Sequence, residues 1–381
     1  MRHGGAELVG SLPGTERLLI NFTQHSGFLQ ASATHKLFYW CATEYHLFVE
    51  SDKDATKKPL IIWFSGGPGC SSVVALLNAI GPFEFAQNGH LQLNPYSWHK
   101  TIKENYDAIK DFFKKHPKFL KNPLYLMGES YAGIFVPVLA VHILKNGKDN
   151  KFNLKGLALG NPFLHEVLNI HTSLIYAYEH ALIDQHDWDN FVEDCCHGCE
   201  DGCDFRPGRL RGPCLTAVND MYAEIWNSGL NPFDIYRDCS PNSANLQLQA
   251  EKSGLSLVGY KFLGPAEVTK SYKKEYDDMS ATFKWLMSKK FSILLYYGDT
   301  DLVCNFLMGQ RFAYKLNLKM SGREKQNWHV DGHAGFKTLY QTASANLTFL
   351  TVRGAGHMAA QWRAPQVFHA VSQFIQNKEL S

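Results

Sequence analysis

The centre of this sequence is Leu124-Tyr125-Leu126-Met127-Gly128-Glu129-Ser130-Tyr131-Ala132-Gly133, an apolar run that ends abruptly in a Gly-x-Ser-x-Gly pattern. A second apolar run follows from Ile134 to Leu139, so the stretch predicts a buried strand, a sharp turn and a helix. Ser130 falls at the apex of the turn, where Cβ atoms at positions 128 and 133 would clash with neighbouring backbone. The helix directs its N-terminal amides toward whatever Ser130 attacks. Ser130 is therefore a candidate nucleophile, although so short a pattern also arises by chance.

The composition is that of a globular protein with a large core. Of the 381 residues 45% are hydrophobic and 19% are charged, which suits one domain with an insertion as well as two domains. The formal net charge of +2 provides no basic face, so we expect no nucleic-acid partner. No apolar run reaches the length of a membrane span, and the first residues lack the apolar core of a signal peptide. Nothing in the sequence predicts a cofactor.

The cysteines are crowded, because five of the nine fall within twenty residues. Crowding of this kind indicates disulfides or a metal site. Zinc sites favour paired Cys-x-x-Cys units, and Cys196-x-x-Cys199 has no second unit at that spacing. We therefore predict disulfides and no metal site. The five are Cys195, Cys196, Cys199, Cys203 and Cys214.

Two stretches match the N-glycosylation pattern, Asn21-Phe22-Thr23 and Asn346-Leu347-Thr348. Each match is weak alone, but both agree with the crowded cysteines, since disulfides form in oxidising compartments. Together they predict a lysosomal or secreted protein, with a signal peptide expected upstream of the given chain.

The order of segments predicts an α/β fold with a mostly parallel sheet. Residues 36–49 are rich in aromatics and predict early antiparallel strands. The apolar run at 59–64 leads into Ser65-Gly66-Gly67-Pro68-Gly69-Cys70-Ser71-Ser72, a loop whose free amides are candidates for holding an anion. The remaining predicted elements are a helix over 101–115, buried strands near 154–162, 293–298 and 347–352, and a last helix over 365–377.

From about residue 164 to about 285 the sequence changes character. Helix-like stretches at 165–180 and 220–226 alternate with the cysteine cluster and with polar sequence, as in an insertion that lies over a sheet. We therefore predict a hydrolase core in two parts, residues 1–163 and 286–381, with a helical, cysteine-containing cap at residues 164–285.

Two further strands end in residues that a nucleophilic serine needs, Asp301 and His357. Strand ends of a parallel sheet share one edge, and the order Ser, Asp, His is that of α/β-hydrolases. In that arrangement His357 takes the Ser130 proton and Asp301 orients the imidazole. Gly67 and Tyr131 would offer backbone amides to the oxyanion. Asp299 competes with Asp301, but its position suits a turn cap better.

At this point the sequence resembles the serine carboxypeptidase family, and within it the animal lysosomal members. The resemblance covers the chain from about residue 12 and implies an α/β-hydrolase with a cap insertion. It also implies release of C-terminal residues from peptides at acidic pH, in the lysosome or outside the cell. The stretches that carry it are Gly66-Gly67-Pro68-Gly69-Cys70-Ser71-Ser72, Asn94-Pro95-Tyr96-Ser97-Trp98, Gly128-Glu129-Ser130-Tyr131-Ala132-Gly133, Gly298-Asp299-Thr300-Asp301 and Gly354-Ala355-Gly356-His357-Met358.

The resemblance implies roles for further residues beside the triad of Ser130, Asp301 and His357. Glu129 would help to hold the terminal carboxylate of the substrate. Gly67 and Tyr131 would form the oxyanion hole. The positions that match the family's substrate site are Trp63, Ser65, Gly66, Cys304 and Met358.

The sequence departs from the family in its carboxylate-binding residues. The family has an Asn before Gly-Gly and a Glu downstream, where this chain has Ser65 and Ala79. With one carboxyl missing, the titration of Glu129 should depend less on the charge of a neighbouring carboxyl group. We expect weaker binding of C-terminal carboxylates and a bias toward ester or amide substrates.

Two segments of the family are missing. After Trp98 the chain passes directly to the helix near Thr101, so about 30 residues that would form one strand and its connection are absent. Loss of this strand would leave its neighbours in the sheet with unpaired backbone groups. A second stretch is missing between Cys239 and Tyr272, including the family partners of Cys70 and Cys239, which would leave both thiols free. An incomplete gene model, a splice form and a pseudoenzyme are competing interpretations.

The leading hypothesis is a serine carboxypeptidase that acts on peptides with a free C-terminus. A catalytically impaired relative that stabilises a partner is the alternative, and an esterase or acyltransferase comes third. The resemblance implies a homodimer or a lysosomal glycosidase as protein partners.

Overall fold

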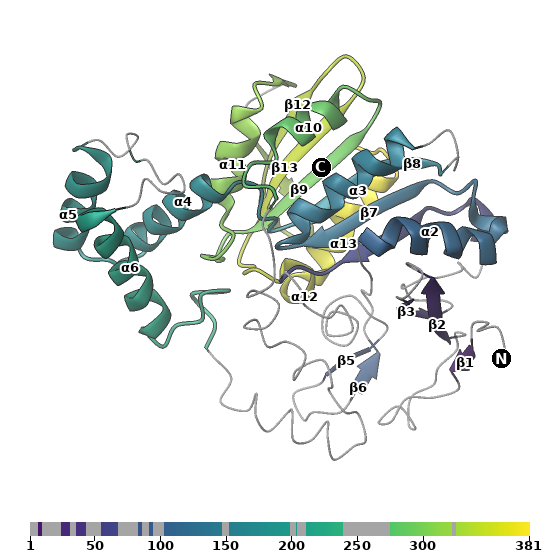
Figure 1. Ribbon diagram of the computed structural model, residues 1–381, viewed down its shortest axis with the longest axis horizontal. Coiled ribbons are helices and arrows are strands. Elements are labelled where there is room, and N and C mark those ends of the chain that lie inside the picture. Colours follow the sequence, from purple (N-terminus) through teal and green to yellow (C-terminus); the bar gives the residue numbers. More distant parts are fainter. Residues whose placement is uncertain are drawn as a thin grey trace.

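The computed structural model combines a large mixed sheet, covering helices, a helical arm and small antiparallel sheets (Figure 1). It describes residues 7–9, 24–30, 36–42, 55–67, 83–85, 91–93, 103–146, 152–198, 203, 211–238, 275–321 and 325–381. The predicted residues Asn21, Cys70, Ala79, Cys199 and Cys239 lie outside these ranges.

The central sheet has eight strands in the order β10-β12-β13-β9-β8-β7-β4, with β11 also paired to β12. The five strands from β4 to β13 run parallel to one another, which confirms the predicted fold class. The parallel strands are β4 (Leu60–Phe64), β7 (Leu124–Glu129), β8 (Leu154–Gly160), β9 (Ser292–Gly298) and β13 (Asn346–Val352). Antiparallel strands complete one side: β10 (Lys319–Met320), β11 (Gln326–His329) and β12 (His333–Gln341).

Helices cover both faces of the parallel strands, which is why these strands are mostly apolar in sequence. One face packs against α2 (Lys103–Lys115), α3 (Ala132–Lys145), α10 (Ser280–Met287) and α11 (Phe306–Lys315). The other face packs against α13 (Ala364–Ile375) and the short α12 (Ala359–Trp362). Short 3₁₀ turns precede β4 and β7, η1 (Ala55–Lys57) and η2 (Pro117–Phe119). The parallel strands are therefore held in a three-layer core.

A helical arm projects from the sheet after β8 (Figure 1). It contains α4 (Glu166–Glu179), α5 (Gln185–Cys196) and α6 (Gly212–Asn227), which pack around a hydrophobic cluster of their own. Disulfides join Cys195 to Cys214 and Cys196 to Cys203, so the prediction of disulfides is confirmed. Core packing against the sheet resumes at Met279. The boundaries proposed for the cap, residues 164–285, stay a prediction.

The first strands form a separate antiparallel sheet of β1 (Glu7–Val9), β2 (Gln24–Gln30) and β3 (Lys36–Ala42). A second small pair joins β5 (Phe83–Phe85) and β6 (Leu91–Leu93). Among the described residues, β4 pairs with β7 alone and is the outermost strand of the central sheet on that side. The expectation that the missing segment leaves a strand without a neighbour stays a prediction.

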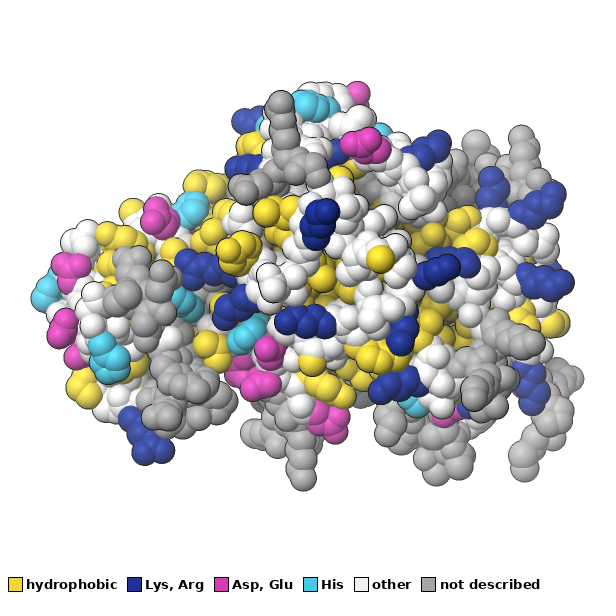
Figure 2. All heavy atoms as spheres, turned by 90° about the horizontal axis from the view of Figure 1, so that it is seen from above, with side chains coloured by type: hydrophobic (Ala, Val, Ile, Leu, Met, Phe, Trp, Pro, Cys, Tyr) yellow, Lys and Arg dark blue, Asp and Glu magenta, His cyan; other side chains and the backbone are white. Residues whose placement is uncertain are grey.

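The surface is mixed in charge. Figure 2 shows Lys and Arg side chains spread over much of one face, between apolar and uncharged atoms. Within the described ranges, every helix is too short or too polar to cross a bilayer.

Candidate active site

The Gly-x-Ser-x-Gly turn forms between β7 and α3. Ser130 has a φ of 64°, a left-handed conformation that residues other than glycine adopt rarely. A Cβ on Gly128 would lie 2.6 Å from the Phe64 carbonyl oxygen and 2.6 Å from Ala132 Cβ. Only glycine at this position lets the turn approach β4 so closely.

Backbone hydrogen bonds hold the turn in its strained conformation. The Ser130 amide donates to the Gly160 carbonyl at 3.0 Å, and the Ser130 carbonyl accepts from Gly133 and Phe163, each at 2.9 Å. The end of β8 and the segment after it therefore fix Ser130 from one side. Strain of this kind persists where the surrounding structure determines the backbone.

The glycine-rich loop after β4 approaches the turn from the other side. A Cβ on Gly66 would lie 2.5 Å from Ser130 Cβ and 2.7 Å from the Tyr131 nitrogen. Gly67 has a φ of 111°, which a residue with a side chain would adopt only with strain. The structure therefore brings the loop that contains Gly67 against Ser130 and the amide of Tyr131.

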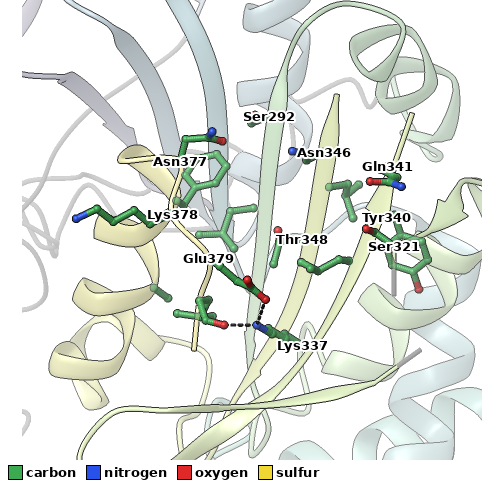
Figure 3. A pocket seen from close by; sticks show the side chains of 16 residues that line it. Ser292, Ser321, Lys337, Tyr340, Gln341, Asn346, Thr348, Asn377, Lys378 and Glu379 are labelled. Atoms are coloured by element: carbon green, nitrogen blue, oxygen red, sulfur yellow. Dashed lines mark hydrogen bonds and ion pairs between the residues drawn. The ribbon is translucent and has the colours of Figure 1, made fainter. Parts of the chain in front are cut away.

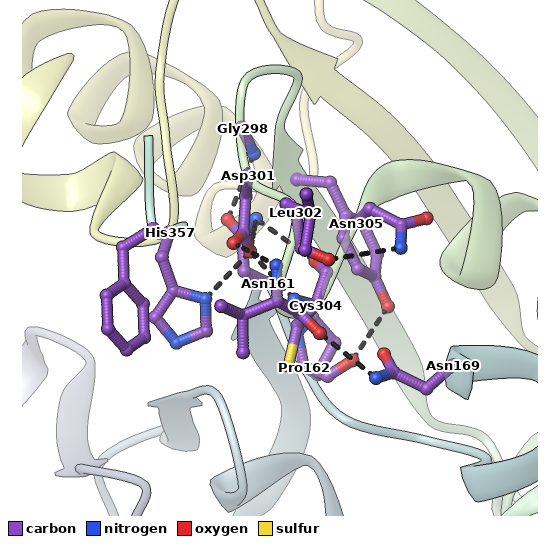
Figure 4. A network of polar contacts seen from close by, with 12 residues as sticks. Asn161, Pro162, Asn169, Gly298, Asp301, Leu302, Cys304, Asn305 and His357 are labelled. Atoms are coloured by element: carbon purple, nitrogen blue, oxygen red, sulfur yellow. Dashed lines mark hydrogen bonds and ion pairs between the residues drawn. The ribbon is translucent and has the colours of Figure 1, made fainter. Parts of the chain in front are cut away.

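Asp301 and His357 meet at the same edge of the sheet, one after β9 and the other after β13 (Figure 4). His357 Nδ1 lies 2.7 Å from Asp301 Oδ2, and both side chains are buried. Burial lowers the pKa of His357, but the charge and hydrogen bond of Asp301, with the charge of Glu129, outweigh it and raise the pKa above its ordinary value. Among the described residues, no hydrogen bond joins His357 to Ser130, a contact that often forms only with substrate.

Asp299 has a different task from Asp301. Its Oδ1 accepts the backbone N–H of Gly354 at 2.6 Å, so it caps the turn between β13 and His357. Burial raises the pKa of Asp299, and the Gly354 hydrogen bond opposes that rise. Asp299 thus supports the loop that carries His357 without touching the imidazole.

The Asp301 carboxylate accepts several hydrogen bonds besides that of His357. The amides of Val303 and Cys304 donate to Oδ1 at 2.9 Å and to Oδ2 at 3.2 Å. The Asn161 side chain donates to Oδ2 at 2.8 Å. Sequence reasoning missed Asn161, although its position directly after a parallel strand places it at the catalytic edge.

Glu129, Trp63 and Tyr296 each have a buried polar atom near the face of the sheet that α13 covers. Burial raises the pKa of Glu129 to about 7, which the charge of His357 opposes and that of Asp301 supports. Glu129 Oε2, Trp63 Nε1 and the Tyr296 hydroxyl are buried without a hydrogen-bond partner among the described residues. Buried polar atoms of this kind favour a polar ligand group.

The other predicted substrate residues surround the same edge. Cys304 is a buried free thiol whose pKa burial raises, together with the charges of Asp301 and Glu129, while a hydrogen bond from Ser130 opposes this rise. Met358 follows His357 and is half-buried at the start of α12. Ser65 is half-buried at the end of β4, and Trp63 is buried within it.

The arm contributes one residue that the sequence did not indicate. The loop after α6 places the Phe233 ring 5.2 Å from the His357 ring, and the Phe233 carbonyl accepts the His357 amide at 2.7 Å. Trp226, at the end of α6, lies 6.5 Å from Phe233 between ring centres. Both aromatic side chains are exposed, and the Phe233 ring lies beside the imidazole.

A cavity of about 310 Å³ lies at the opposite edge of the sheet, near the first residues of β9 and β13 (Figure 3). The buried Lys337 donates to the Leu380 carbonyl and lies 3.7 Å from Glu379 Oε1. Asn346, the described member of the two glycosylation candidates, is exposed and lines this cavity. The cavity is therefore separate from the edge that carries Ser130.

A mostly parallel sheet with a strained serine turn and a buried His-Asp pair at one edge places the protein in the class of α/β-hydrolases. The profile of the serine carboxypeptidase family matches residues 13–103, 99–262 and 265–377, and the chain belongs to this family.

Individual relatives agree with this assignment. The lysosomal protective protein of Mus musculus is 28% identical over an alignment of 459 residues, which covers 97% of this chain and 94% of the mouse protein. A serine carboxypeptidase of Caenorhabditis elegans is 29% identical, with 98% of this chain and 94% of that protein covered. The solved structure of Kex1, a prohormone-processing carboxypeptidase from Saccharomyces cerevisiae, shares the fold with a TM-score of 0.69. It is 20% identical, with 93% of this chain and 91% of that chain covered.

The matches also bear on the length of this chain relative to its relatives. The family profile matches in three stretches that meet near residues 99–103 and 262–265, and the two missing segments stay a prediction. The alignment to the mouse relative extends over 459 residues, more than the 381 of this chain, so it contains positions that this chain does not fill.

Proposed function

We propose that the chain releases C-terminal residues from peptides through an acyl-enzyme on Ser130. The observation that carries this proposal is the 2.7 Å contact between His357 Nδ1 and Asp301 Oδ2 at the sheet edge that holds the strained Ser130 turn. His357 Nε2 would take the Ser130 proton as the hydroxyl attacks the scissile carbonyl, then give it to the leaving amine. Water would release the acyl group by the same steps.

The oxyanion of the tetrahedral intermediate would be held by the amides of Gly67 and Tyr131. The close approach of Gly66 to the Tyr131 nitrogen supports this assignment, since it places the two backbone segments together. Preorganised donors of this kind contribute about 3–4 kcal/mol each. The positive end of α3 would act in the same direction.

Glu129 would recognise the terminal carboxylate of the substrate in its protonated form. Its pKa of about 7 keeps the carboxyl neutral at acidic pH, so that it can donate a hydrogen bond. Trp63 Nε1 is a second buried donor on the same side of the sheet. Ser65, Gly66, Cys304 and Met358 would line the remaining substrate site.

Two groups with opposing protonation requirements would limit the pH range of the peptidase. His357 must be neutral to act as base, whereas Glu129 must be protonated to bind a carboxylate. Because these two groups interact, the two pH limits of activity are properties of the coupled pair and cannot be assigned to His357 or Glu129 alone. The peptidase would therefore work in a restricted pH interval, while reactions that do not need Glu129 would continue above it.

A catalytically impaired relative that stabilises a partner is the second candidate, favoured by the outermost position of β4 among the described strands. An esterase or acyltransferase activity is the third, favoured by Ala79 and Ser65 in place of the family's carboxylate-binding residues. Self-association and binding to a lysosomal glycosidase belong to the partner-stabilising candidate and rest on the resemblance alone.

Lysosomal or secreted residence is supported by the two disulfides, the name of the mouse relative and the exposed Asn346. Glycosylation at Asn21 and Asn346 would appear as a mass shift on treatment with an N-glycosidase. Loss of that shift in Asn346→Gln would assign the site.

Labelling with a fluorophosphonate tests the catalytic proposal. The folded wild type should label at one serine, and Ser130→Ala should not label. Circular dichroism establishes that both proteins are folded. A folded wild-type chain that takes up no label would overturn the proposal in favour of the partner-stabilising function.

A further inference from the structure

We propose that Asn161 is a positioning residue that sets the orientation and effective charge of Asp301, and through it the base strength of His357. The inference rests on the proposed serine carboxypeptidase function. Asn161 Nδ2 lies 2.8 Å from Asp301 Oδ2, the oxygen that His357 Nδ1 contacts at 2.7 Å (Figure 4). One side chain therefore binds the same carboxylate oxygen as the imidazole.

The orientation of the Asn161 amide is determined by its partners. The Gly298 backbone N–H donates to Asn161 Oδ1 at 2.9 Å, and a backbone N–H can only donate. The opposite atom must then be the nitrogen, which faces Asp301 and also reaches the Cys304 carbonyl at 3.3 Å. The reversed amide would place an oxygen against a carboxylate oxygen and a carbonyl. Asn161 can therefore serve Asp301 only as a donor.

The backbone of Asn161 is held as firmly as its side chain. Its amide donates to the Tyr296 carbonyl at 2.8 Å, and its φ of 36° lies in the left-handed region, which asparagine tolerates better than most residues. The residue is fully buried. Asn161 thus connects the ends of β8 and β9 with the loop that contains Asp301.

A donor on Asp301 Oδ2 has a defined electrostatic consequence. It offsets part of the negative charge that faces His357, so it limits how far Asp301 favours the imidazolium. In the part of the chain that the structure describes, the other titratable or charged groups near this pair are Glu129 on β7, Cys304 in the Asp301 loop, Tyr176 on α4, Tyr297 on β9 and the Asp234–Arg237 pair after α6. Among the described residues, Asn161 supplies the one side-chain donor to Asp301 that does not titrate.

The test compares Asn161→Ala with Asn161→Asp and with Asn169→Ala. Asn169 donates to the Val303 carbonyl at 3.0 Å, so it holds the same loop without contacting Asp301. Asn161→Asp keeps the shape and the acceptor for Gly298 but sets a second carboxyl against Asp301, so the two carboxyls repel or share a proton and the neutral, non-titrating donor is lost. Both changes at position 161 should lower kcat about tenfold to a hundredfold with little change in KM, which is the size of effect seen for residues that orient another functional side chain. Asn169→Ala should leave kcat within about threefold of wild type.

The pH dependence separates positioning from a structural role. Asn161→Ala should move the acid limb of kcat/KM to higher pH by about half a unit or more, because His357 then faces a less compensated carboxylate. The same shift should appear when the His357 ring is titrated by NMR in Ser130→Ala and in the double variant Ser130→Ala/Asn161→Ala. This comparison does not depend on turnover. A wild type that fails to hydrolyse substrate would overturn the proposed function, and the titration would still decide the role of Asn161. An Asn161→Ala protein with wild-type kcat, or equal shifts in the Asn161→Ala and Asn169→Ala proteins, would overturn the inference.

Discussion

The two sides of the candidate active site differ in how firmly their residues are held. On the side of β8, β9 and β13, Asp301 accepts hydrogen bonds from His357, Asn161 and two backbone amides. On the side of β4, the strand is outermost among the described residues, and the buried Trp63 and Glu129 carry polar atoms that have no partner there.

This difference separates chemistry from recognition. The groups that would move the proton are each held by several hydrogen-bond partners, so they can keep their geometry when a nearby segment changes. The groups that would recognise the substrate carboxylate lie where the family's Asn and Glu are replaced by Ser65 and Ala79. We therefore expect a working nucleophile in a site with altered selectivity.

The largest effect should come from the firmly held side. His357→Ala removes the base and should lower kcat by about 10⁴-fold or more, as in other serine hydrolases. Trp63→Phe, a matched aromatic change on the β4 side, should alter kcat far less and act mainly on KM for peptides. Steady-state kinetics on folded proteins decide this, and equal losses in both variants would remove the distinction between the two sides.

Replacing the buried acid on the β4 side should stabilise the protein at high pH. Glu129 has a pKa raised from 4.5 to about 7, so both states are protonated below about pH 4.5, and the folded state must bear a buried charge above about pH 7. Glu129→Gln cannot ionise and should raise the free energy of unfolding by about 2 kcal/mol at pH 8. Denaturant unfolding at pH 4 and pH 8 measures the difference, and a gain of the same size at both pH values would contradict a titration effect.

Restoring the family's carboxyl should sharpen the recognition side. Ala79→Glu is expected to raise the ratio of peptidase to esterase activity about tenfold, since a second carboxyl would share the task of Glu129. Ala79→Gln, of similar size but without a titrating group, serves as the control. If Ala79→Glu leaves the ratio unchanged, the missing carboxyl does not explain the expected weak binding of the substrate carboxylate.

The smallest effect concerns the shape of the pH profile. With a peptide substrate, kcat/KM should fall on the alkaline side as Glu129 ionises, whereas an ester without a free carboxylate should lack that limb. Glu129→Gln should remove the alkaline limb for the peptide and leave the ester profile nearly unchanged. Identical profiles for both substrates in the wild type would show that Glu129 does not bind the carboxylate.

Much of the catalytic edge could be predicted from local sequence, because each residue follows a strand with a strong pattern. Ser130 lies between two glycines, the strand before Asp301 is almost wholly apolar, and the strand before His357 alternates apolar residues with threonines. The antiparallel strands β10, β11 and β12 escaped prediction. In β12, Gly335 and the buried Lys337 interrupt the alternation that would indicate a strand.

The contacts that escaped prediction join segments far apart in the chain. Asn161 bonds to a carboxylate 140 positions later, which follows from the neighbouring positions of β8 and β9. Phe233 meets His357 only because the loop after α6 returns to the sheet. The raised pKa of Glu129 likewise depends on burial and on charges from two other strand ends. None of these relations is encoded in a local pattern.

The most direct test compares one peptide with a free C-terminal carboxylate and the same peptide with a C-terminal amide. The wild type should hydrolyse both, Ser130→Ala should hydrolyse neither, and kcat/KM for the free acid should exceed that for the amide by less than about a hundredfold. A site built with its full set of partners for the carboxylate discriminates by about 10⁴-fold or more. Discrimination of that size, or hydrolysis that survives in Ser130→Ala, would contradict an intact nucleophile beside a weakened carboxylate site.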